Sequence, residues 1–397
     1  MTGRVFVLDN PVQNYAWGSR TAIAELLGRP VPSALPEAEL WMGAHPKAPS
    51  RIVEPAGLGT LDRAIAADPM ALLGRDTCSR FGAELPFLFK VLAAAEPLSI
   101  QAHPNREQAR AGFRRENDAG VPLDAPERSY RDANHKPELV CALTPFDALF
   151  GFRPPDEVAQ KLAPLADEGL ASALDATSAP GGRLRALLQR LLALDGRPRR
   201  ALLERALREA GRRTRDPAWA WVGRLLARYP DDTGALAPLY LNLVRLLPGQ
   251  ALYLPAGELH AYLEGTALEI MASSDNVLRG GLTPKHVDVP ELLATLVFEP
   301  HAPEPLEASP NGAGERVYRT PAREFELGLI EVGGGRPYHS KEGHGLEILL
   351  GLEGAAALHA DGTQASLARG RCVLVPASLP AYELRGSGRI ARARVPA

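Results

Sequence analysis

Two short stretches of sequence share one pattern, and this pattern decides the fold. Residues 249–265 read GQALYLPAGELHAYLEG, and residues 370–386 read GRCVLVPASLPAYELRG. A glycine opens and closes each stretch, and an apolar strand precedes a Pro-Ala pair at the same place in both. The pattern predicts two similar β units, each a β-sandwich or a small barrel. His260 of the first stretch corresponds to Ala381 of the second, which predicts one functional unit and one structural unit.

The amino-acid composition changes along the chain between and around these stretches. Short apolar runs between Pro and Gly, typical of strands, alternate with a Leu-, Ala- and Arg-rich part at residues 155–235. There, leucines recur at the spacing of one helical face: Leu184, Leu187, Leu188, Leu191 and Leu192. Near the C-terminus, Asp361-Gly362 between two alternating segments predicts a hairpin.

We therefore expect a mainly β protein with a helical insertion. The expected parts are a strand-rich part of residues 1–154 and 236–300, a helical part of residues 155–235, and a C-terminal β part of residues 301–397.

Composition excludes several classes of protein. The 397 residues carry 45 Lys and Arg against 47 Asp and Glu, a net charge of −2, which argues against binding nucleic acid by bulk charge. No apolar stretch of about 20 residues could span a membrane. The apolar start of residues 1–9 is short for a signal peptide. The three cysteines form no CxxC motif, which fits a reducing cytoplasm.

Any metal site must use His, Glu, Asp or Gln. Gln101 and His103 are two residues apart and would share one face of a strand. Glu138 follows a proline that can start a strand, and His260 lies at a turn-to-strand junction. Two imidazoles, a carboxylate and an amide oxygen could hold a divalent ion and leave a position open for substrate. Taken singly, each of these residue types is more often structural or on the surface. The spacing therefore leaves open whether they form a metal site or are separate structural and surface residues.

A second group of chemically active residues falls in residues 269–286, EIMASSDNVLRGGLTPKH. It contains the carboxylates Glu269 and Asp275, Arg279 beside two glycines, and Lys285. Such a loop can approach a phosphate or an enediolate closely. The alternative is a turn-rich connector with solvated charges.

Lys136 stands two residues before Glu138. By strand period the two side chains share a face, although Pro137 intervenes. A lysine there could donate to an anion, or it could be an ordinary surface lysine.

Together, these segments resemble the type I phosphomannose isomerases. The matching motifs occur in the family's order between residue 10 and about residue 300, and no position in them departs from the family pattern. They are QNYAWGS (13–19), ELWMGAH (39–45), PLSIQAHP (97–104), NHKPE (134–138), FDALFGFR (146–153), PAGELHAY (255–262) and residues 269–286.

The resemblance implies two cupin-like jelly-roll barrels, with a helical domain inserted in the first, and one zinc ion per chain. The family's zinc ligands fall on Gln101, His103, Glu138 and His260. Its substrate pocket falls on Ser99, Lys136, Glu269, Asp275, Arg279 and Lys285, with Tyr262 nearby. In the C-terminal unit, His339, His344 and Glu347 echo a cupin metal motif only loosely, and we expect no metal there.

The activity implied is the interconversion of mannose 6-phosphate and fructose 6-phosphate through an enediol. Arg279 would stabilise the enediolate or the phosphate. Glu269 and Asp275 are candidates for the general base, and His135 and Lys136 remain open.

Two other classes stay open: a metal-dependent cupin oxygenase, and a sugar-binding protein with two cupin barrels and no activity. In each case the partner is a small molecule, with no nucleic acid and no membrane, and we expect a monomer.

Overall fold

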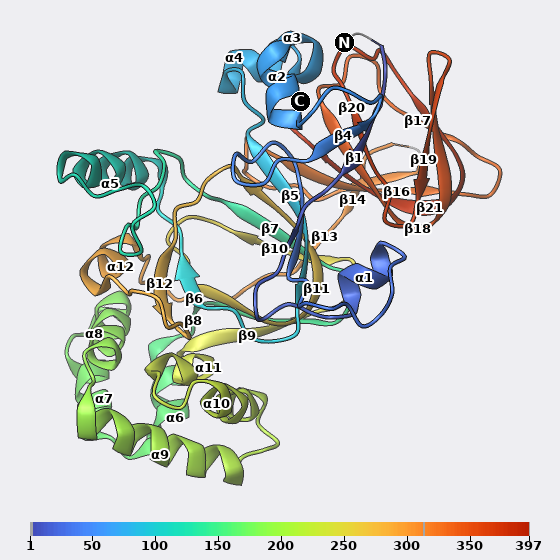
Figure 1. The fold of residues 1–397 in the computed structure, drawn as a ribbon. Helices are drawn as coiled ribbons and strands as arrows, with labels where there is room; N and C mark the ends of the chain where they lie inside the picture. The colour runs from blue at the N-terminus through green and yellow to red at the C-terminus, as the bar shows by residue number, and fades with distance from the viewer. Residues whose placement is uncertain (1–2, 313, 397) are drawn as a thin grey trace.

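The computed structural model describes residues 3–312 and 314–396, and these fold into two β-sheets with helices around them. Figure 1 shows helices α6–α10, within residues 155–228, gathered at one end of the molecule, away from the C-terminal strands. Among the described residues, no helix has both the length and the apolar character needed to cross a membrane.

The first sheet carries six of the candidate site residues: Gln101, Glu138, His260, Tyr262, Glu269 and Arg279. Its strands are β2 (Val12–Gln13), β3 (Glu39–Met42), β5 (Phe87–Ala94), β6 (Ile100–Ala102), β7 (Glu138–Ala142), β8 (Phe146–Phe152), β9 (Leu241–Leu246), β10 (Gln250–Leu254), β11 (His260–Ala272), β12 (Leu278–Gly281) and β13 (Leu306–Glu307). The main path is β13-β10-β7-β11-β5-β3-β2, while β6 and β8 pair with the first part of β11.

The second sheet joins strands from both ends of the chain. Its strands are β1 (Phe6–Asp9), β4 (Arg51–Glu54), β14 (Ser309–Pro310), β15 (Glu315–Val317), β16 (Glu326–Val332), β17 (Tyr338–His339), β18 (Glu347–Ala360), β19 (Thr363–Ala368), β20 (Cys372–Val375) and β21 (Glu383–Arg394). The path is β14-β15-β16-β21-β18-β20-β1-β4, so β1 and β4 extend a sheet that is otherwise C-terminal.

Helices α6–α11 lie in the sequence between β8 and β9, at residues 155–240. The α-helices are α1 (Ala22–Leu26), α2 (Leu61–Ala67), α3 (Pro69–Leu73), α4 (Arg75–Phe81), α5 (Arg106–Asp118), α6 (Pro155–Leu162), α7 (Glu168–Asp175), α8 (Pro180–Leu192), α9 (Gly196–Arg212), α10 (Pro217–Arg228), α11 (Ala237–Tyr240) and α12 (Val289–Thr295). On α8, four of the five leucines at helical spacing (Leu184, Leu187, Leu188 and Leu191) form the buried face, as the sequence predicts, and Leu192 is half-buried.

The two matching stretches of sequence have matching backbone roles. β10 and β20 follow the opening glycines, and each pairs with a strand, β7 or β18, that pairs in turn with β11 or β21. The closing glycines, Gly265 and Gly386, lie inside β11 and β21 with φ of 125° and 109°. A Cβ there would meet a carbonyl oxygen at 2.6 Å or 2.5 Å, so both positions require glycine.

One apolar core connects the two sheets. It contains Phe89 and Leu268 from the first sheet and Ile348 and Leu374 from the second, all fully buried. Burying each such side chain contributes about 1.5–3 kcal/mol, so the shared core holds the sheets together. The expected hairpin is confirmed, since β18 and β19 pair across Asp361-Gly362 with both turn residues at positive φ.

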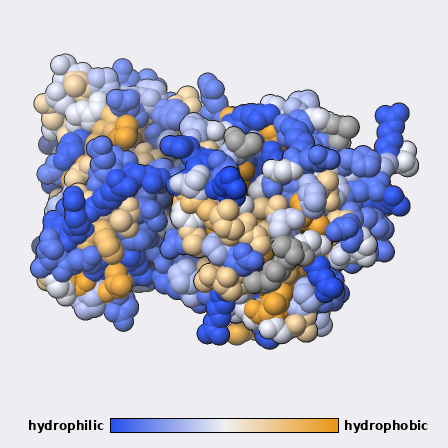
Figure 2. Space-filling view, turned by 90° about the horizontal axis from the view of Figure 1, so that it is seen from above, coloured by the Kyte–Doolittle hydropathy of each residue, from blue (hydrophilic) through white to orange (hydrophobic). Residues whose placement is uncertain are grey.

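The face of the molecule seen from above in Figure 2 is mainly hydrophilic. Figure 2 shows hydrophilic residues over much of one face, with apolar residues in small separate patches. Scattered apolar residues of this kind are normal on a protein surface, and none needs a partner to explain it.

Candidate active site

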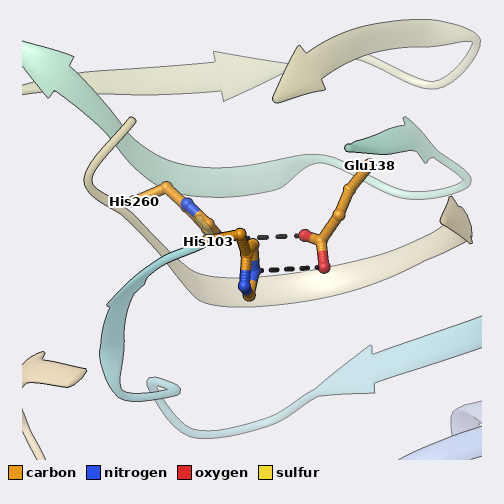
Figure 3. Close-up of side chains that lie close together, drawn as sticks. All are labelled: His103, Glu138 and His260. Carbon is orange, nitrogen blue, oxygen red and sulfur yellow. Dashed lines mark ion pairs between the residues drawn. The ribbon is translucent and has the colours of Figure 1, made fainter. Parts of the chain in front are cut away.

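Three of the expected metal ligands converge in the first sheet. His103 follows the end of β6, Glu138 begins β7 and His260 begins β11 (Figure 3). The Nε2 atom of His103 lies 3.3 Å from Oε1 of Glu138, and that of His260 lies 3.7 Å from Oε2. One ligand atom from each residue falls within 4.8 Å of the others, and all three residues are buried.

The two imidazoles are arranged as metal ligands. Nδ1 of His103 lies 2.7 Å from the Asn276 carbonyl oxygen, and Nδ1 of His260 lies 3.0 Å from that of Glu258. Donation from Nδ1 leaves each Nε2 with a free lone pair, and neither Nε2 has a hydrogen-bond partner among the described residues.

Burial keeps the imidazole rings of His103 and His260 neutral. Burial lowers the pKa of His260 to about 4 and is also the main cause that lowers the pKa of His103. Neutral imidazoles beside a buried carboxylate fit a divalent cation such as zinc.

Gln101 lies in register with this group. It pairs with His260 of β11 on one side and with Arg279 of β12 on the other. Residues opposite each other in antiparallel strands point to the same face, so the three side chains form a row. Gln101 and Arg279 both line the cavity described below.

Glu138 has two further partners from the predicted site. Nζ of Lys136 lies 3.1 Å from its Oε1, and the Tyr262 hydroxyl donates to its Oε2 over 3.3 Å. Burial raises the pKa of Glu138, but the Lys136 ammonium outweighs burial and holds it well below its usual range. Glu138 is therefore an anion before any metal binds.

Arg279 and Lys285 line the cavity together with a third cation, Arg131, which the sequence interpretation missed. Among the described residues, none of the three has a carboxylate within ion-pair distance. Burial, with Arg131 nearby, lowers the pKa of Arg279, and burial, with Arg279 nearby, lowers that of Lys285. Crowded cations without counterions form a binding place for an anion.

Two further predicted residues, Ser99 and Asp275, also lie at the cavity. Ser99 lines the cavity. Asp275 also lines it, and its carboxylate lies 2.8 Å from Nζ of Lys47 and 3.5 Å from Nε2 of His45. Burial raises the pKa of Asp275, but these two partners lower it below its usual range.

His135 does not line the cavity. Its Nε2 lies 2.8 Å from both Glu324 and Arg106.

Glu269 belongs to a buried cluster on three strands. Its Oε2 lies 2.8 Å from Nζ of Lys90, which also lies 3.5 Å from Glu39, and the Trp41 indole donates to Glu39 over 2.8 Å. Burial raises the pKa of Glu269, although Lys90 opposes this. Lys90 was missed in the sequence, where its signal is a single charge within the apolar run Phe87–Ala94.

One cavity of about 1400 Å³ is lined by Gln101, Glu138, Glu269, Asp275, Arg279 and Lys285. The sheet supplies the candidate metal ligands Gln101 and Glu138. The wall on the opposite side comes from the helical region and includes Arg199, Tyr229 and Asp232. A cavity of this size and polarity suits a small phosphorylated ligand.

Comparisons with known proteins agree with this geometry. Residues 5–155 match the family model described as phosphomannose isomerase type I, catalytic domain. The mannose-6-phosphate isomerase of Escherichia coli (strain K12) is 44% identical over 387 residues, which cover 97% of this chain and 98% of the relative.

Solved structures agree in the same way. A zinc-bound mannose 6-phosphate isomerase matches with TM-score 0.92 and 42% identity, covering 99% of this chain and 100% of that one. The Salmonella typhimurium enzyme bound to substrate (f6p) and zinc matches with TM-score 0.92 and 43% identity, covering 99% of this chain and 100% of that one. With a near full-length relative at 44% identity, the chain belongs to the type I mannose-6-phosphate isomerase family.

Proposed function

We propose that this protein interconverts D-mannose 6-phosphate and D-fructose 6-phosphate with one zinc ion per chain. The observation that carries the proposal is the His103–Glu138–His260 group, whose Glu138 lines the same cavity as the cations Arg131, Arg279 and Lys285. Zinc-bound and substrate-bound relatives of the same fold support it.

The metal would be held by His103, Glu138 and His260, with the Gln101 amide oxygen completing the ligands. When bound, zinc supplies a Lewis acid without redox chemistry, which can polarise or orient sugar oxygens. Lys136 and the Tyr262 hydroxyl hold the Glu138 carboxylate in place.

The cations divide between two tasks. Arg279 stands in one row with Gln101 and His260, so we assign it to the enediolate oxygen that forms next to the metal ligands. Lys285 is exposed at the cavity wall, and together with Arg131 and Ser99 it would bind the phosphate.

For the proton transfer between C2 and C1, we assign Glu269 as the general base. A base works best when its pKa lies near the working pH, and the pKa of Glu269 is raised while that of Asp275 is lowered. Asp275 would instead orient Lys47 and His45 at the wall. His135, outside the cavity, would act only by supporting its neighbour Lys136.

The domain division expected from sequence is part of the proposal. It consists of two cupin-like jelly-roll barrels, with a catalytic one at residues 1–154 and 236–300, a metal-free one at 301–397, and a helical insertion at 155–235. We also propose a monomer in the cytoplasm, with neither nucleic acid nor membrane as a partner.

The test is a coupled assay of mannose 6-phosphate conversion before and after chelation. We expect activity to disappear with the chelator and to return with zinc. No turnover by zinc-loaded protein would overturn the proposal. Sugar-phosphate binding without turnover would then indicate a binding protein, and oxygen consumption at an electrode would indicate an oxygenase.

A further inference from the structure

The Asn276 side chain joins two loops of the site and is fully buried. Its Nδ2 donates to the backbone oxygens of Asp132 and Asn134, both over 2.9 Å, and to Oδ1 of Asp132 over 3.2 Å. Its Oδ1 accepts from the backbone N–H of Arg131 over 2.7 Å and from that of Asp132 over 3.2 Å. Both Nδ2 and Oδ1 of Asn276 therefore form hydrogen bonds with one loop, residues 131–134.

The same residue contacts a candidate metal ligand through its backbone. The Asn276 carbonyl oxygen accepts from Nδ1 of His103 over 2.7 Å, which fixes the ring with Nε2 toward Glu138. Asp132 strengthens the junction, because its carboxylate accepts from the Ser274 hydroxyl over 2.8 Å and from the Asp275 N–H over 2.7 Å.

Asn276 therefore stands between the two halves of the active site. On one side is His103, and on the other is Arg131, whose side chain lines the cavity among the unpaired cations. The Asn276 side chain does not itself line the cavity. Any effect on ligands must pass through the residues that it holds.

We propose that Asn276 is a positioning residue that couples the orientation of His103 to the placement of the cationic wall around Arg131. The inference rests on the proposed function, which assigns a metal to His103 and a phosphate to Arg131. Groups that orient metal ligands typically change metal affinity 10- to 100-fold when they are replaced.

The substitution that tests this role most directly is Asn276→Asp. It keeps the size of the side chain and the backbone carbonyl, but it places a carboxylate oxygen against two carbonyl oxygens and the Asp132 carboxylate. The 131–134 loop must then shift, and the Asn276 carbonyl shifts with it.

The experiment measures binding of Zn²⁺ by chelator competition and of inorganic phosphate by calorimetry, together with KM and kcat. We expect the zinc dissociation constant of Asn276→Asp to rise about 10-fold or more, with weaker phosphate binding and a raised KM. The control is Asn311→Asp in the C-terminal region, where the amide donates to Glu315 over 2.8 Å. It should lower thermal stability without changing either affinity.

Zinc and phosphate affinities within twofold of wild type in folded Asn276→Asp would overturn the proposal, even if its thermal stability falls. If the variant does not fold, Ser274→Ala is measured instead, since it removes the hydroxyl that donates to Asp132 over 2.8 Å and accepts from the Asn276 N–H over 3.2 Å, and the same twofold criterion applies. Wild-type protein that binds zinc without isomerising the sugar would defeat the proposed function, while the two affinities would still test the role of Asn276.

Discussion

Glu138 and Glu347 occupy equivalent positions in the two sheets. Glu138 pairs with Leu254, the residue before the Pro-Ala pair of the first matching stretch. Glu347 pairs with Val375, the residue before the Pro-Ala pair of the second. Each carboxylate also accepts from a tyrosine hydroxyl, from Tyr262 over 3.3 Å or from Tyr382 over 2.6 Å.

The two glutamates differ in the groups that face them. Beside Glu138 stand the Lys136 ammonium and two neutral imidazoles with free Nε2 atoms. Beside Glu347, Arg392 donates from Nη1 over 2.9 Å and also forms an ion pair with Glu315. A guanidinium thus neutralises the carboxylate that, in the first sheet, would face a metal.

Arg392→Met should therefore destabilise the protein without altering the active site. Removing one partner leaves buried, unpaired carboxylates, which costs about 3–5 kcal/mol in the free energy of unfolding. Urea unfolding measures the cost, and KM for mannose 6-phosphate should stay unchanged. The control is Arg389→Met on the same strand, whose partly exposed ion pairs are worth about 1 kcal/mol or less. Equal losses in both variants would contradict a special role for Arg392.

The sequence predicted local features well and long-range pairings poorly. The glycines of the matching stretches and the α8 leucines depend on short spacings that a pattern can show. For the four candidate metal ligands, spread over residues 101–260, spacing left a structural role open, and the family resemblance decided. The roles of Lys90 and Arg131 were not predicted, because these roles depend on residues from distant strands and loops. His135 was named for its motif, and no short-range pattern could show that its ring meets Glu324 rather than the cavity.

His260→Ala should remove zinc and activity together. The mutation deletes one imidazole ligand, so zinc content after dialysis should fall far below one ion per chain, and turnover should fall in parallel. Elemental analysis and the coupled assay measure the two. His339→Ala is the matched control, because that side chain is exposed. A zinc-free His260→Ala protein with full activity would defeat the metal assignment.

The metal-free protein should lose stability as the pH falls from about 6.5 toward 4. Burial lowers the pKa of His260 to about 4 in the folded state, whereas a histidine in the unfolded chain has a pKa of about 6.5. Between these two pH values the unfolded state binds a proton that the folded state does not, so the free energy of unfolding falls as the pH falls from about 6.5 to about 4. This difference corresponds to about 3 kcal/mol. Urea midpoints of chelated protein at several pH values measure it. His260→Gln should show a shallower dependence, and an equal slope would refute the assignment.

Arg279→Ala should lower turnover while zinc stays bound. The guanidinium is assigned to charge that develops in the transition state, and loss of one such donor costs about 10²–10³ in kcat. Zinc content and kcat are measured on the same sample, and Arg208→Ala on the exposed side of α9 serves as the control. Nearly unchanged turnover would show that Arg279 does not have this role.

Lys90→Met tests the buried cluster that the sequence did not reveal. Without the ammonium, Glu39 and Glu269 remain buried as unpaired charges, which should cost about 3–5 kcal/mol near pH 7.5. Because burial already raises the pKa of Glu269, acid should neutralise the carboxylates and reduce the loss. Urea unfolding across pH measures this, with the partly exposed Lys161→Met as a control that should cost about 1 kcal/mol or less.

The same variant separates a structural role of Lys90 from a role through Glu269. If Glu269 is the base, raising its pKa further leaves it protonated at neutral pH, so the acidic limb of the kcat profile should move to higher pH. A lower kcat with an unmoved profile would point to a base other than Glu269. A stability loss that is equal at every pH would show that the two carboxylates are not left charged in the variant.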